Sequence, residues 1–531
     1  KIWGADPREI AESDLIVVWG GNPVSTQVNV MTHIAKARKT RGAKLVVIDP
    51  YRTPTAEAAD IHIPLRPGTD GALACAVMQV LFAENLADWD YMRDFSDGPE
   101  RLQQHLTTRT PEWAEEITGI PADDIRDLAR LYGRTERAYL RVGYGFTRSR
   151  NGAANMHAVT CLPVVTGKWK HRGGGALFSN RELYGVDSTL IKGLDVVDPN
   201  TRALDMSQIG RVLTGDAKAL MDGPPVTVLF TQNINPAEVA PETTRVIDGM
   251  MRDDLFTCVH EQFMTASAKL ADIVLPATMF LEHEDMYQGG GHFYLQVHKA
   301  LIEPPGECRS NVDVINGLAR RLGSDYPAFH MTAWELIDDA LRRSGRPGAD
   351  EVLAEGWIDC TKPFEEAHFL NGFGHDDGKF HFAADWSRVG ADCDAMSALP
   401  DHLDVIDGAT AVHPYRLVAA PARRFLNTSF TEMPSSRKKE GRPMALIHPD
   451  TCKALGLEEG DRVRLGNDLG DLVVHVRPFD GLQDHTVVVE GIWPNEAFEE
   501  GRGINTIVSA DAALPGGGAA FHDTAIWMRP A

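Results

Sequence analysis

The sequence predicts an α/β protein that contains two related parallel-sheet domains and a C-terminal β-barrel. Three observations lead to this prediction: a strand, helix, strand order near the N-terminus, a recurrence of that order around Pro236, and a change to short alternating strands after His413. The length of 531 residues suffices for roughly three domains of about 150 residues each. The net charge of −22 argues against nucleic acid or an anionic membrane surface as the main partner.

The first unit begins with an apolar run at residues 13–20, which is typical of a fully buried parallel strand and ends in the turn Gly21-Asn22-Pro23. Residues 30–41 have helical spacing, and residues 44–48 form a second apolar run that ends at Asp49. Strand, helix, strand in this order is a βαβ unit. A third short strand is expected at residues 59–64.

The second unit repeats this order with apolar runs at residues 226–230, 255–259 and 271–276. The interval from Pro23 to Asp49 equals that from Pro236 to Glu261 to within one residue, and an Ala-Asp-Ile triplet follows in both halves. Such agreement indicates an internal duplication of a Rossmann-like unit.

Open parallel sheets bind ligands at the carboxyl ends of their strands, with a phosphate near the first turn and an acid after the second strand. Two such units predict two nucleotide-bearing ligands, or one ligand with two halves. The alternative is a pair of plain scaffolds that hold no nucleotide. A nicotinamide dehydrogenase is disfavoured because neither first turn carries G-x-G-x-x-G.

Between the two units, Gly143 and Gly145 follow an expected strand, and a long helix is expected at residues 153–166. Glycine at a strand end permits close approach of the backbone to a flat ligand, although a plain turn explains it equally well. The surrounding basic residues suit either a pyrophosphate or, more commonly, a solvated face. They are Arg148, Arg150, Lys168, Lys170, His171 and Arg172.

The sequence contains no motif for a metal centre. Seven cysteines occur without any C-x-x-C pair, so no zinc ribbon or iron–sulfur signature is present. Three histidines at residues 283–298 lack H-E-x-x-H spacing and favour a loop over a metal site. No apolar stretch approaches the length of about 18 residues that a membrane-spanning helix needs.

The chain is expected to divide into residues 1–140, the first dinucleotide-binding α/β domain, and 141–325, the second. Residues 326–410 read as a polar, mostly helical or irregular segment, and 411–531 as the barrel. Strands are expected at 446–448, 462–465, 472–476 and 486–490, separated by tight turns. The basic tract at 435–442 is expected to be a solvated loop.

These motifs as a set resemble the molybdopterin oxidoreductases of the dimethyl sulfoxide reductase superfamily. The resemblance covers nearly the whole chain through W-G-G-N-P at 19–23, V-I-D-P-Y-R-T at 47–53, L-R-P-G-T-D at 65–70 and A-D-I-V-L-P at 271–276. The barrel contributes L-G-L-E-E-G-D-R-V at 455–463, N-T at 505–506 and F-H-D at 521–523. The resemblance implies a bis(molybdopterin guanine dinucleotide) centre with molybdenum or tungsten, one dinucleotide in each α/β domain, and a double-psi-like barrel that closes over both pterins.

The resemblance also implies which residues contact this cofactor. In the first half they are Gly21, Asn22, Pro23, Asp49, Arg52, Gly68, Asp70, Gly143 and Gly145. In the second half they are Gln232, Asn235, Pro236, Glu261 and Asp272, although Asp272 also suits a role at the end of a strand. In the barrel they are Arg424, Asn427, Ser429, Asn505, Phe521 and His522.

The sequence departs from the family in lacking the N-terminal C-x-x-C type [4Fe–4S] motif and the side chain that ligates the metal. We expect both upstream of Lys1, so no metal ligand lies within this chain and the catalytic residues are unknown. The resemblance implies transfer of an oxygen atom or of two electrons to or from a small substrate, with electrons passing through the cluster to a possible partner protein. We expect a cytoplasmic location, with a periplasmic one left open.

The substrate is open at this stage. Formate dehydrogenases of the family carry a substrate arginine shortly after the Gly173–Gly175 run, where this sequence has Ser179, with Arg181 nearby. The stretch at 423–430 looks more like the thiosulfate and polysulfide reductases. The alternative function is a non-catalytic scaffold related to the large iron–sulfur subunit of respiratory NADH dehydrogenase.

Overall fold

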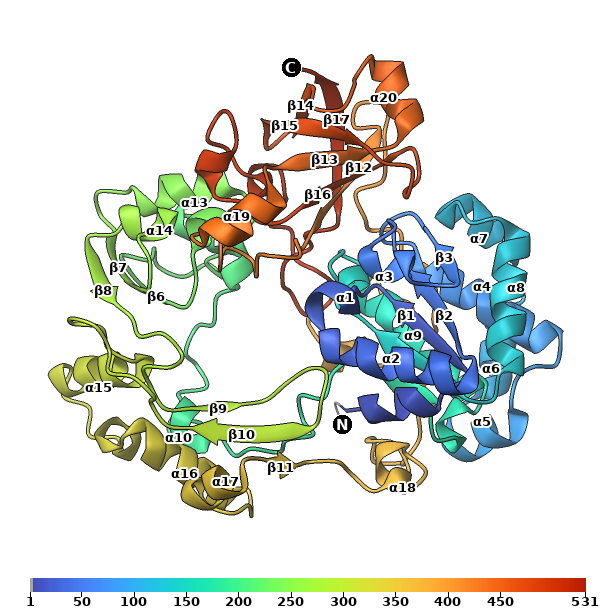
Figure 1. Cartoon of the computed structure of the whole chain (residues 1–531), viewed down its shortest axis with the longest axis horizontal. Helices are drawn as coiled ribbons and strands as arrows, with labels where there is room; N and C mark the ends of the chain where they lie inside the picture. Colours follow the sequence, from blue (N-terminus) through green and yellow to red (C-terminus); the bar gives the residue numbers. More distant parts are fainter. Residues whose placement is uncertain (1–2) are drawn as a thin grey trace.

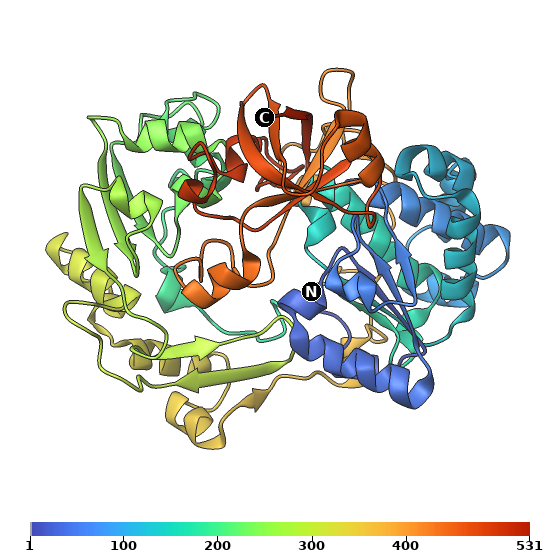
Figure 2. The same ribbon diagram turned by 45° about the horizontal axis from the view of Figure 1, so that its top comes forward.

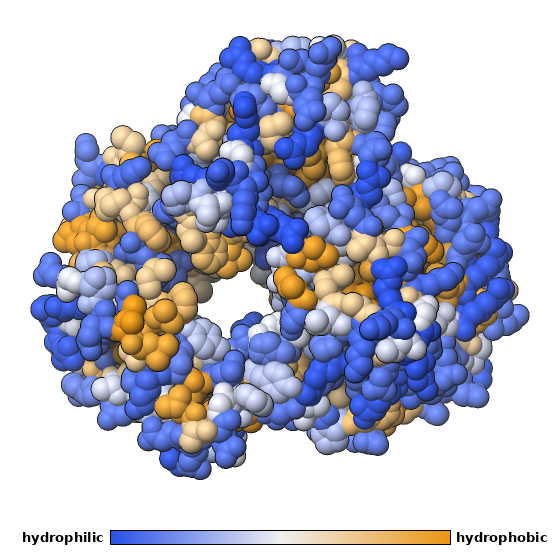
Figure 3. Space-filling model, in the orientation of Figure 1, coloured by the Kyte–Doolittle hydropathy of each residue, from blue (hydrophilic) through white to orange (hydrophobic). Residues whose placement is uncertain are grey.

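The computed structural model describes residues 3–531 and arranges them around a central opening. The first α/β part lies on one side of the opening and the second on the other, as Figure 1 shows. The barrel stands above both, and a band of strands and helices closes the lower side. The space-filling view in Figure 3 shows that side chains leave the opening clear in this direction.

The first sheet is parallel throughout and has the strand order β3-β2-β1-β4-β5. Its central strands are buried along their whole length, as expected for a sheet covered on both faces. The apolar runs expected near residues 13–20, 44–48 and 59–64 are confirmed as strands. The bounds are β1 Leu15–Trp19, β2 Lys44–Ile48, β3 Ile61–Ile63, β4 Ala138–Val142 and β5 Gly175–Leu177.

The expected domain boundary at residue 140 does not match this sheet. Strand β4 pairs with β1 in the register Leu15 to Ala138, and β5 pairs with β4. Residues up to Leu177 therefore belong to the first domain. The physical reason is that a strand joins a sheet through backbone pairing with a partner far away in the sequence, and the local pattern around residue 140 does not show that partner.

Helices cover both faces of the first sheet. Helix α2 ends where Gly42 adopts a left-handed conformation with φ +69°, and it carries a basic last turn that suits the negative end of the helix dipole. Helix α4 is buried almost throughout and packs on α7, α8 and α9. In Figure 1, α2 lies in front of the sheet and α7 and α8 stand to its right. The bounds are η1 Pro7–Glu12, α1 Pro23–Thr26, α2 Val28–Arg41, α3 Pro54–Glu57, α4 Asp70–Ala83, α5 Trp89–Phe95, α6 Pro99–Leu106, α7 Pro111–Thr118, α8 Ala122–Arg134 and α9 Gly152–Val165.

The second α/β part has a smaller parallel sheet with the order β6-β7-β8. Its apolar core includes Val246, Met250 and Leu255, which pack against residues of the sheet and of the short helices around it. The second βαβ order read from the sequence is confirmed. The bounds are α10 Thr189–Lys192, α11 Ile209–Leu213, β6 Val228–Gln232, α12 Pro236–Val239, α13 Thr243–Met250, β7 Phe256–Glu261, α14 Ala266–Lys269 and β8 Ile273–Pro276.

The lower band contains an antiparallel sheet, β11-β10-β9, and the helices of the polar segment. The bounds are β9 Asp285–Tyr287, β10 Tyr294–His298, α15 Asn311–Arg321, α16 Ala333–Arg343, α17 Ala349–Glu355, β11 Ile358–Asp359 and α18 Phe364–Ala367.

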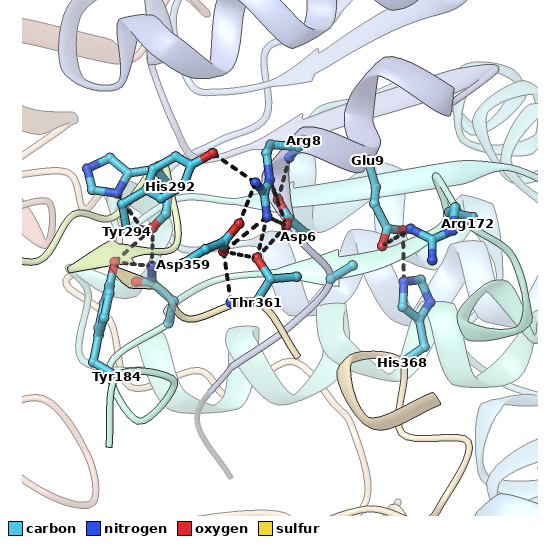
Figure 4. A network of polar contacts seen from close by, with 12 residues as sticks. Asp6, Arg8, Glu9, Arg172, Tyr184, His292, Tyr294, Asp359, Thr361 and His368 are labelled. Atoms are coloured by element: carbon cyan, nitrogen blue, oxygen red, sulfur yellow. Dashed lines mark hydrogen bonds and ion pairs between the residues drawn. The ribbon is translucent and has the colours of Figure 1, made fainter. Parts of the chain in front are cut away.

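Polar contacts tie this band to the N-terminal segment (Figure 4). The guanidinium of Arg8 donates to Asp6 at 2.6 Å, to the hydroxyl of Tyr294 at 2.8 Å and to Asp359 at 3.0 Å. Nearby, the fully buried His368 bonds Glu9 at 2.9 Å. These contacts join η1 to β10, β11 and α18, so the ring closes on itself.

The C-terminal part is a closed six-stranded barrel with the order β12-β16-β13-β15-β14-β17. The predicted barrel is confirmed, and its strands at 446–448, 462–465, 472–476 and 486–490 match four of the six. Two pairs, β12 with β16 and β13 with β15, are parallel, and the others are antiparallel. The bounds are β12 Tyr415–Ala420, α19 Pro434–Glu440, β13 Met444–Ile447, α20 Pro449–Leu455, β14 Arg462–Asn467, β15 Gly470–Pro478, β16 Thr486–Glu490, η8 Ile504–Thr506 and β17 Thr524–Pro530.

Within residues 3–531, no helix is both long and apolar enough to span a bilayer. The barrel sits between the two α/β parts in both ribbon views (Figures 1 and 2), where it faces the carboxyl ends of strands β1, β2 and β4.

Candidate cofactor-binding site

A cavity of about 610 Å³ lies where the carboxyl edge of the first sheet meets the barrel. The loops after β1, β2 and β4 form one wall, and residues of the barrel from Val418 to His522 form the other. The second α/β part contributes Ile234, residues 205–207 and residues 239–241. The position agrees with the general rule that parallel sheets bind ligands beyond the carboxyl ends of their strands.

The loops after β1 and β4 touch each other, which explains their glycines. The amide of Gly143 donates to the carbonyl of Trp19 at 2.8 Å, and the amide of Gly145 donates to that of Gly20 at 2.9 Å. A Cβ atom on Gly143 would lie 2.2 Å from the carbonyl oxygen of Gly20. Only glycine allows the two backbones to lie this close, and the contact forms the floor of the cavity.

Two buried carboxyl groups face the cavity from the first sheet. Burial raises the pKa of Asp49 to about 8, and the nearby Asp70 and Glu490 add to this shift. Burial also raises the pKa of Asp70 to about 7, although the indole of Trp19 donates to Asp70 at 2.7 Å and opposes the shift. Neither carboxyl has a Lys or Arg among the groups that shift its pKa.

The side chain of Asn22 fixes the turn after β1. Its Oδ1 accepts a hydrogen bond of 2.7 Å from the hydroxyl of Thr55, and that hydroxyl accepts one from the amide of Val24. The Asn22 amide also donates to Ser25 at 3.1 Å. These bonds hold the Gly21-Asn22-Pro23 turn against α3.

The turn after β6 repeats this arrangement. The Oδ1 of Asn235 accepts a hydrogen bond of 2.7 Å from the hydroxyl of Ser267, which accepts one from the amide of Ala237. The Asn235 amide donates to Glu238 at 2.6 Å. Equivalent bonds, with spacings that agree to within one residue, occur in both halves and extend the duplication from the sequence to single atoms.

The Ala-Asp-Ile acids are duplicated too, but they lie at the opposite edge of each sheet. The carboxylate of Asp60 accepts from the amide of Leu45 at 2.7 Å, and that of Asp272 accepts from the amide of Thr257 at 2.7 Å. Both amides lie at the amino end of their strand. Asp272 therefore lies away from the cavity, and its position fits the reading of it as a residue that caps a strand.

The barrel wall depends on one buried carboxylate. Asp523 accepts hydrogen bonds from Arg150 at 3.1 Å and from Arg416 at 3.2 Å, and also from the amide of Asp407. This anchors Phe521 and His522, which line the cavity. The ring Nδ1–H of His522 donates to the carbonyl of Gly145 at 2.9 Å, and burial lowers the pKa of this histidine to about 4.

The structure brings twelve of the predicted cofactor residues to the cavity wall. They are Gly21, Asn22, Pro23, Asp49, Gly68, Asp70, Gly143, Gly145, Asn427, Asn505, Phe521 and His522. Eight lie outside its walls. They are Arg52, Gln232, Asn235, Pro236, Glu261, Asp272, Arg424 and Ser429.

Most of these eight have other contacts or lie at the surface. Arg52 pairs with Asp480 at 2.6 Å, and Gln232 bonds His260 at 3.0 Å. Arg424 and Ser429 are exposed on the loop after β12. Glu261, at the carboxyl end of β7, keeps the position expected from the duplication, and burial raises its pKa.

Sequence reasoning missed several residues of the wall. Gln27, Tyr51, Arg141 and Tyr144 line the cavity, and of these Arg141 had a visible signal as a charged residue inside an apolar strand. The expected basic region contributes Arg148 alone. Lys170 and His171 pair with Asp88 and Glu136 away from the cavity.

The chain matches two known families over most of its length. Residues 3–321 match "Molybdopterin oxidoreductase", and residues 415–525 match "Molydopterin dinucleotide binding domain". The two matches cover the α/β parts and the barrel, which are the parts that surround the cavity.

Individual relatives agree with this result. "Probable oxidoreductase YoaE" of Bacillus subtilis is 33% identical over 98% of this chain and 75% of its own length. The dimethyl sulfoxide/trimethylamine N-oxide reductase of Rhodobacter capsulatus is 27% identical over 94% of this chain and 69% of its own length. The solved structure of acetylene hydratase from Pelobacter acetylenicus shares the fold with a TM-score of 0.75 at 19% identity, over 99% of this chain and 81% of that one. The protein therefore belongs to the molybdopterin oxidoreductase family of the dimethyl sulfoxide reductase superfamily and is an oxidoreductase.

Proposed function

We propose that this chain holds a bis(molybdopterin guanine dinucleotide) cofactor with molybdenum or tungsten and transfers an oxygen atom, or two electrons, to or from a small substrate. The observation that carries the proposal is the pair of buried carboxyl groups, Asp49 and Asp70, on one cavity wall. Each has a raised pKa and no basic partner to neutralise it.

Guanine fits these two groups because its ring N–H and amino group are donors and a carboxylate is purely an acceptor. Burial makes a charged carboxylate unfavourable unless a ligand supplies hydrogen bonds to it. A guanine at Asp49 and Asp70 would supply them. The nucleotide phosphates would then lie toward the Gly21-Asn22-Pro23 turn on the same wall.

The barrel side of the cavity fits a pterin. The side-chain amide of Asn505 donates to the carbonyl of Glu238 at 2.8 Å, but its Oδ1 is buried and has no partner among the described residues. A pterin carries N–H groups that could donate to this oxygen. Gly518 also lines the wall, and a Cβ atom there would meet nothing within 4 Å, so the wall leaves room for a flat ring.

The duplicated turns support a second dinucleotide in the other half. Asn235 is held by the same bonds as Asn22, and Glu261 ends β7 as Asp49 follows β2. We propose that Gln232, Pro236 and Glu261 serve the second dinucleotide outside the 610 Å³ cavity. The residues at 239–241 link that half to the cavity.

When bound, the metal centre supplies the two-electron redox chemistry, and the chain positions it and controls access. Burial lowers the pKa of His522 to about 4, which favours the neutral imidazole at pH 7, and its bond to the carbonyl of Gly145 holds the ring on the barrel wall. The carboxyls and glycines of the first sheet orient the dinucleotide. We propose that an iron–sulfur cluster and a metal ligand are supplied from upstream of Lys1 and that electrons pass to a partner protein.

The relatives support a small substrate without fixing which one. Among them are reductases of dimethyl sulfoxide and a formate dehydrogenase subunit from Methanocaldococcus jannaschii that depends on coenzyme F420. The cytoplasmic location stays a prediction.

The test is direct measurement of the cofactor. The purified protein is treated with acid, the released guanine nucleotide is quantified by chromatography, and molybdenum and tungsten are measured by mass spectrometry. We expect about two guanine nucleotides and one metal atom per chain. Absence of nucleotide from protein expressed in a host that makes the cofactor would contradict the proposal.

A matched pair of variants links the result to the site. Asp49→Asn removes a buried acceptor and is expected to lower the bound guanine at least severalfold. Asp480→Asn removes a carboxylate that is 70% exposed in its side chain and pairs with Arg52 outside the cavity. It is expected to keep the wild-type guanine content. Equal losses in both variants would show that the carboxyl at position 49 has no specific role.

A further inference from the structure

Arg141 is a buried cation without a charged partner among residues 3–531. It lies in β4, a strand that is buried along its whole length, and only 2% of its surface is exposed. Its Nη1 donates to the carbonyls of Leu177 at 2.9 Å, Phe178 at 3.3 Å and Val142. All three acceptors are uncharged backbone carbonyls, and they lie at or next to the carboxyl ends of β4 and β5.

The rest of the guanidinium is incompletely satisfied. Nη2 has two hydrogens and donates one to Oε1 of Gln27, and Nε is enclosed with no partner among the described residues. Burial lowers the pKa of Arg141, and no carboxylate opposes the shift. A guanidinium nevertheless stays charged in proteins, so the charge persists at this position.

A comparison within the chain shows that this is unusual. Arg416 is the other arginine that is buried to this degree, with 5% of its surface exposed, and it forms an ion pair with Asp523 at 3.2 Å. A buried charge is unfavourable unless it is paired. Arg141 therefore has the environment of a cation whose partner is a ligand.

Arg141 lies at the cavity described above. It is one of the residues of the wall, together with Gln27 and Tyr144, and its carbonyl contacts place it where β4 and β5 end. The carboxamide of Gln27 is the neutral analogue of a carboxylate, and its oxygen already occupies the Nη2 donor. An anion that displaced this oxygen would meet both Nη2 and the unused Nε, which form a two-pronged donor edge.

We propose that Arg141 is the residue that binds the substrate in this cavity and that the substrate is a small anion, a carboxylate or an oxoanion. The identification of this anion as the substrate rests on the proposed function. The anion-binding property itself does not depend on it. The same chemistry could serve a phosphate of the cofactor, so the experiments separate the two sources.

The first experiment measures selenate binding to the purified protein by titration calorimetry, in preparations whose guanine content is known. Selenate is a compact oxoanion that a two-pronged guanidinium edge can hold. Arg141→Met keeps an apolar side chain of similar length and is expected to weaken selenate binding about tenfold or more, as loss of a charge-assisted hydrogen bond implies. Arg141→Lys retains the charge and is expected to bind with intermediate affinity.

Arg148→Met is the matched control. Arg148 also lines the cavity, but it is exposed and its side chain forms no hydrogen bond or ion pair with the part of the chain that the structure describes. If general positive charge in the cavity holds the anion, Arg148→Met will weaken binding as much as Arg141→Met does, and the proposal is wrong. A larger loss for Arg141→Met supports it.

The second experiment does not depend on a variant that folds. Crystals of the wild-type protein are soaked in selenate, and the anomalous signal of selenium locates the anion. A peak within about 4 Å of the Arg141 guanidinium, at an affinity that calorimetry confirms in solution, supports the proposal. Selenate bound only elsewhere, or no saturable binding, overturns it.

Cofactor content distinguishes substrate from phosphate. If Arg141 binds the substrate, cofactor-loaded protein still binds selenate, and Arg141→Met retains its guanine and metal while its KM for an anionic substrate rises more than its kcat falls. If Arg141 instead binds a cofactor phosphate, loading abolishes selenate binding and Arg141→Met loses guanine, and the substrate assignment is overturned. Protein that holds no guanine at all contradicts the proposed function but leaves the selenate result readable.

Discussion

The indole nitrogen of Trp19 donates a hydrogen bond of 2.7 Å to the carboxyl of Asp70, and both groups are almost completely buried. Trp19 ends β1, and Asp70 begins α4. The bond therefore joins the strand that carries the Asn-Pro turn to the helix that carries a carboxyl of the cavity wall. It stabilises the ionised form of Asp70 against the effect of burial.

The raised pKa values of two buried carboxyl groups predict that stability depends on pH. Asp49 has a pKa of about 8 and Asp70 of about 7 in the folded chain, against an ordinary value of 3.8. At pH values between the ordinary pKa and the raised pKa, each of these carboxyls holds its proton in the folded state and loses it in the unfolded state. Their contribution to the free energy of unfolding therefore falls as pH rises. Urea unfolding of the cofactor-free protein at pH values from 5 to 8 measures how the free energy of unfolding changes with pH. The double variant D49N/D70N is expected to flatten the slope, whereas D480N keeps it. A pH slope in D49N/D70N that equals the wild-type slope would refute the assignment.

Replacement of Trp19 by Phe tests the indole bond itself. The ring remains, but the donor to Asp70 is lost, so the pKa of Asp70 is expected to rise further. In the same urea experiment, the loss of stability attributed to Asp70 is expected to extend to higher pH than in the wild type. In a D70N background the substitution should leave the pH slope unchanged, and a change there would mean that Trp19 acts through another group.

The contact between the loops after β1 and β4 predicts a strict requirement for glycine at position 143. A Cβ in Gly143→Ala would lie 2.2 Å from the carbonyl oxygen of Gly20, so backbone must move. Overpacking of this kind costs roughly 1–3 kcal/mol of unfolding free energy. Gly408→Ala is the control, because its Cβ would meet nothing within 4 Å and its φ is not in the left-handed region. Similar losses in both variants would mean that the two loops do not rely on this close approach.

The duplicated asparagines predict a graded effect on stability. Asn235→Ala would leave the buried Ser267 hydroxyl and amide without their acceptor, at a loss of about 1–3 kcal/mol in unfolding free energy. Asn22→Ala is expected to lose less, because the site is partly exposed and water can replace the acceptor. Chemical denaturation of both variants shows which one loses more unfolding free energy. A larger loss for Asn22→Ala than for Asn235→Ala would argue against the proposed equivalence of the two turns.

The carboxylate of Asp523 predicts the largest single effect. Asp523→Asn leaves Arg416 buried without a charged partner, and loss of one member of a buried ion pair costs about 3–5 kcal/mol. The double variant R416M/D523L removes both charges and is expected to be clearly more stable than D523N alone. Urea midpoints measure both. Asp339→Asn, which breaks an exposed pair with Arg343, is expected to show no measurable change. Equal stability of D523N and wild type would contradict the role given to this pair.

The sequence was informative wherever structure follows from local pattern. Strand β2 has the predicted limits, and the spacing of Pro23 and Pro236 identified the duplication that the bonds of Asn22 and Asn235 confirm. Pairing between distant strands was not visible, so the expected boundary cut through β4 and placed β5 in the second domain, and β12 and β17 were not recognised.

The acids of the Ala-Asp-Ile triplets show a second reason for error. An acid that follows a parallel strand, such as Asp49, lies at the ligand edge of the sheet. One that precedes a strand, such as Asp272, lies at the opposite edge. Motif matching ignored this direction. Arg141 was missed for a different reason, since the direction of its side chain depends on how β4 is placed in the sheet.

The division of the cavity wall between Gly21 and His522 has a consequence for biosynthesis. A ribosome adds about 5–20 residues per second, so the second wall emerges roughly 25–100 s after the first. During that interval the first sheet can fold, but its carboxyls face solvent rather than the barrel. The cavity therefore acquires both of its walls only after nearly the whole chain has been made.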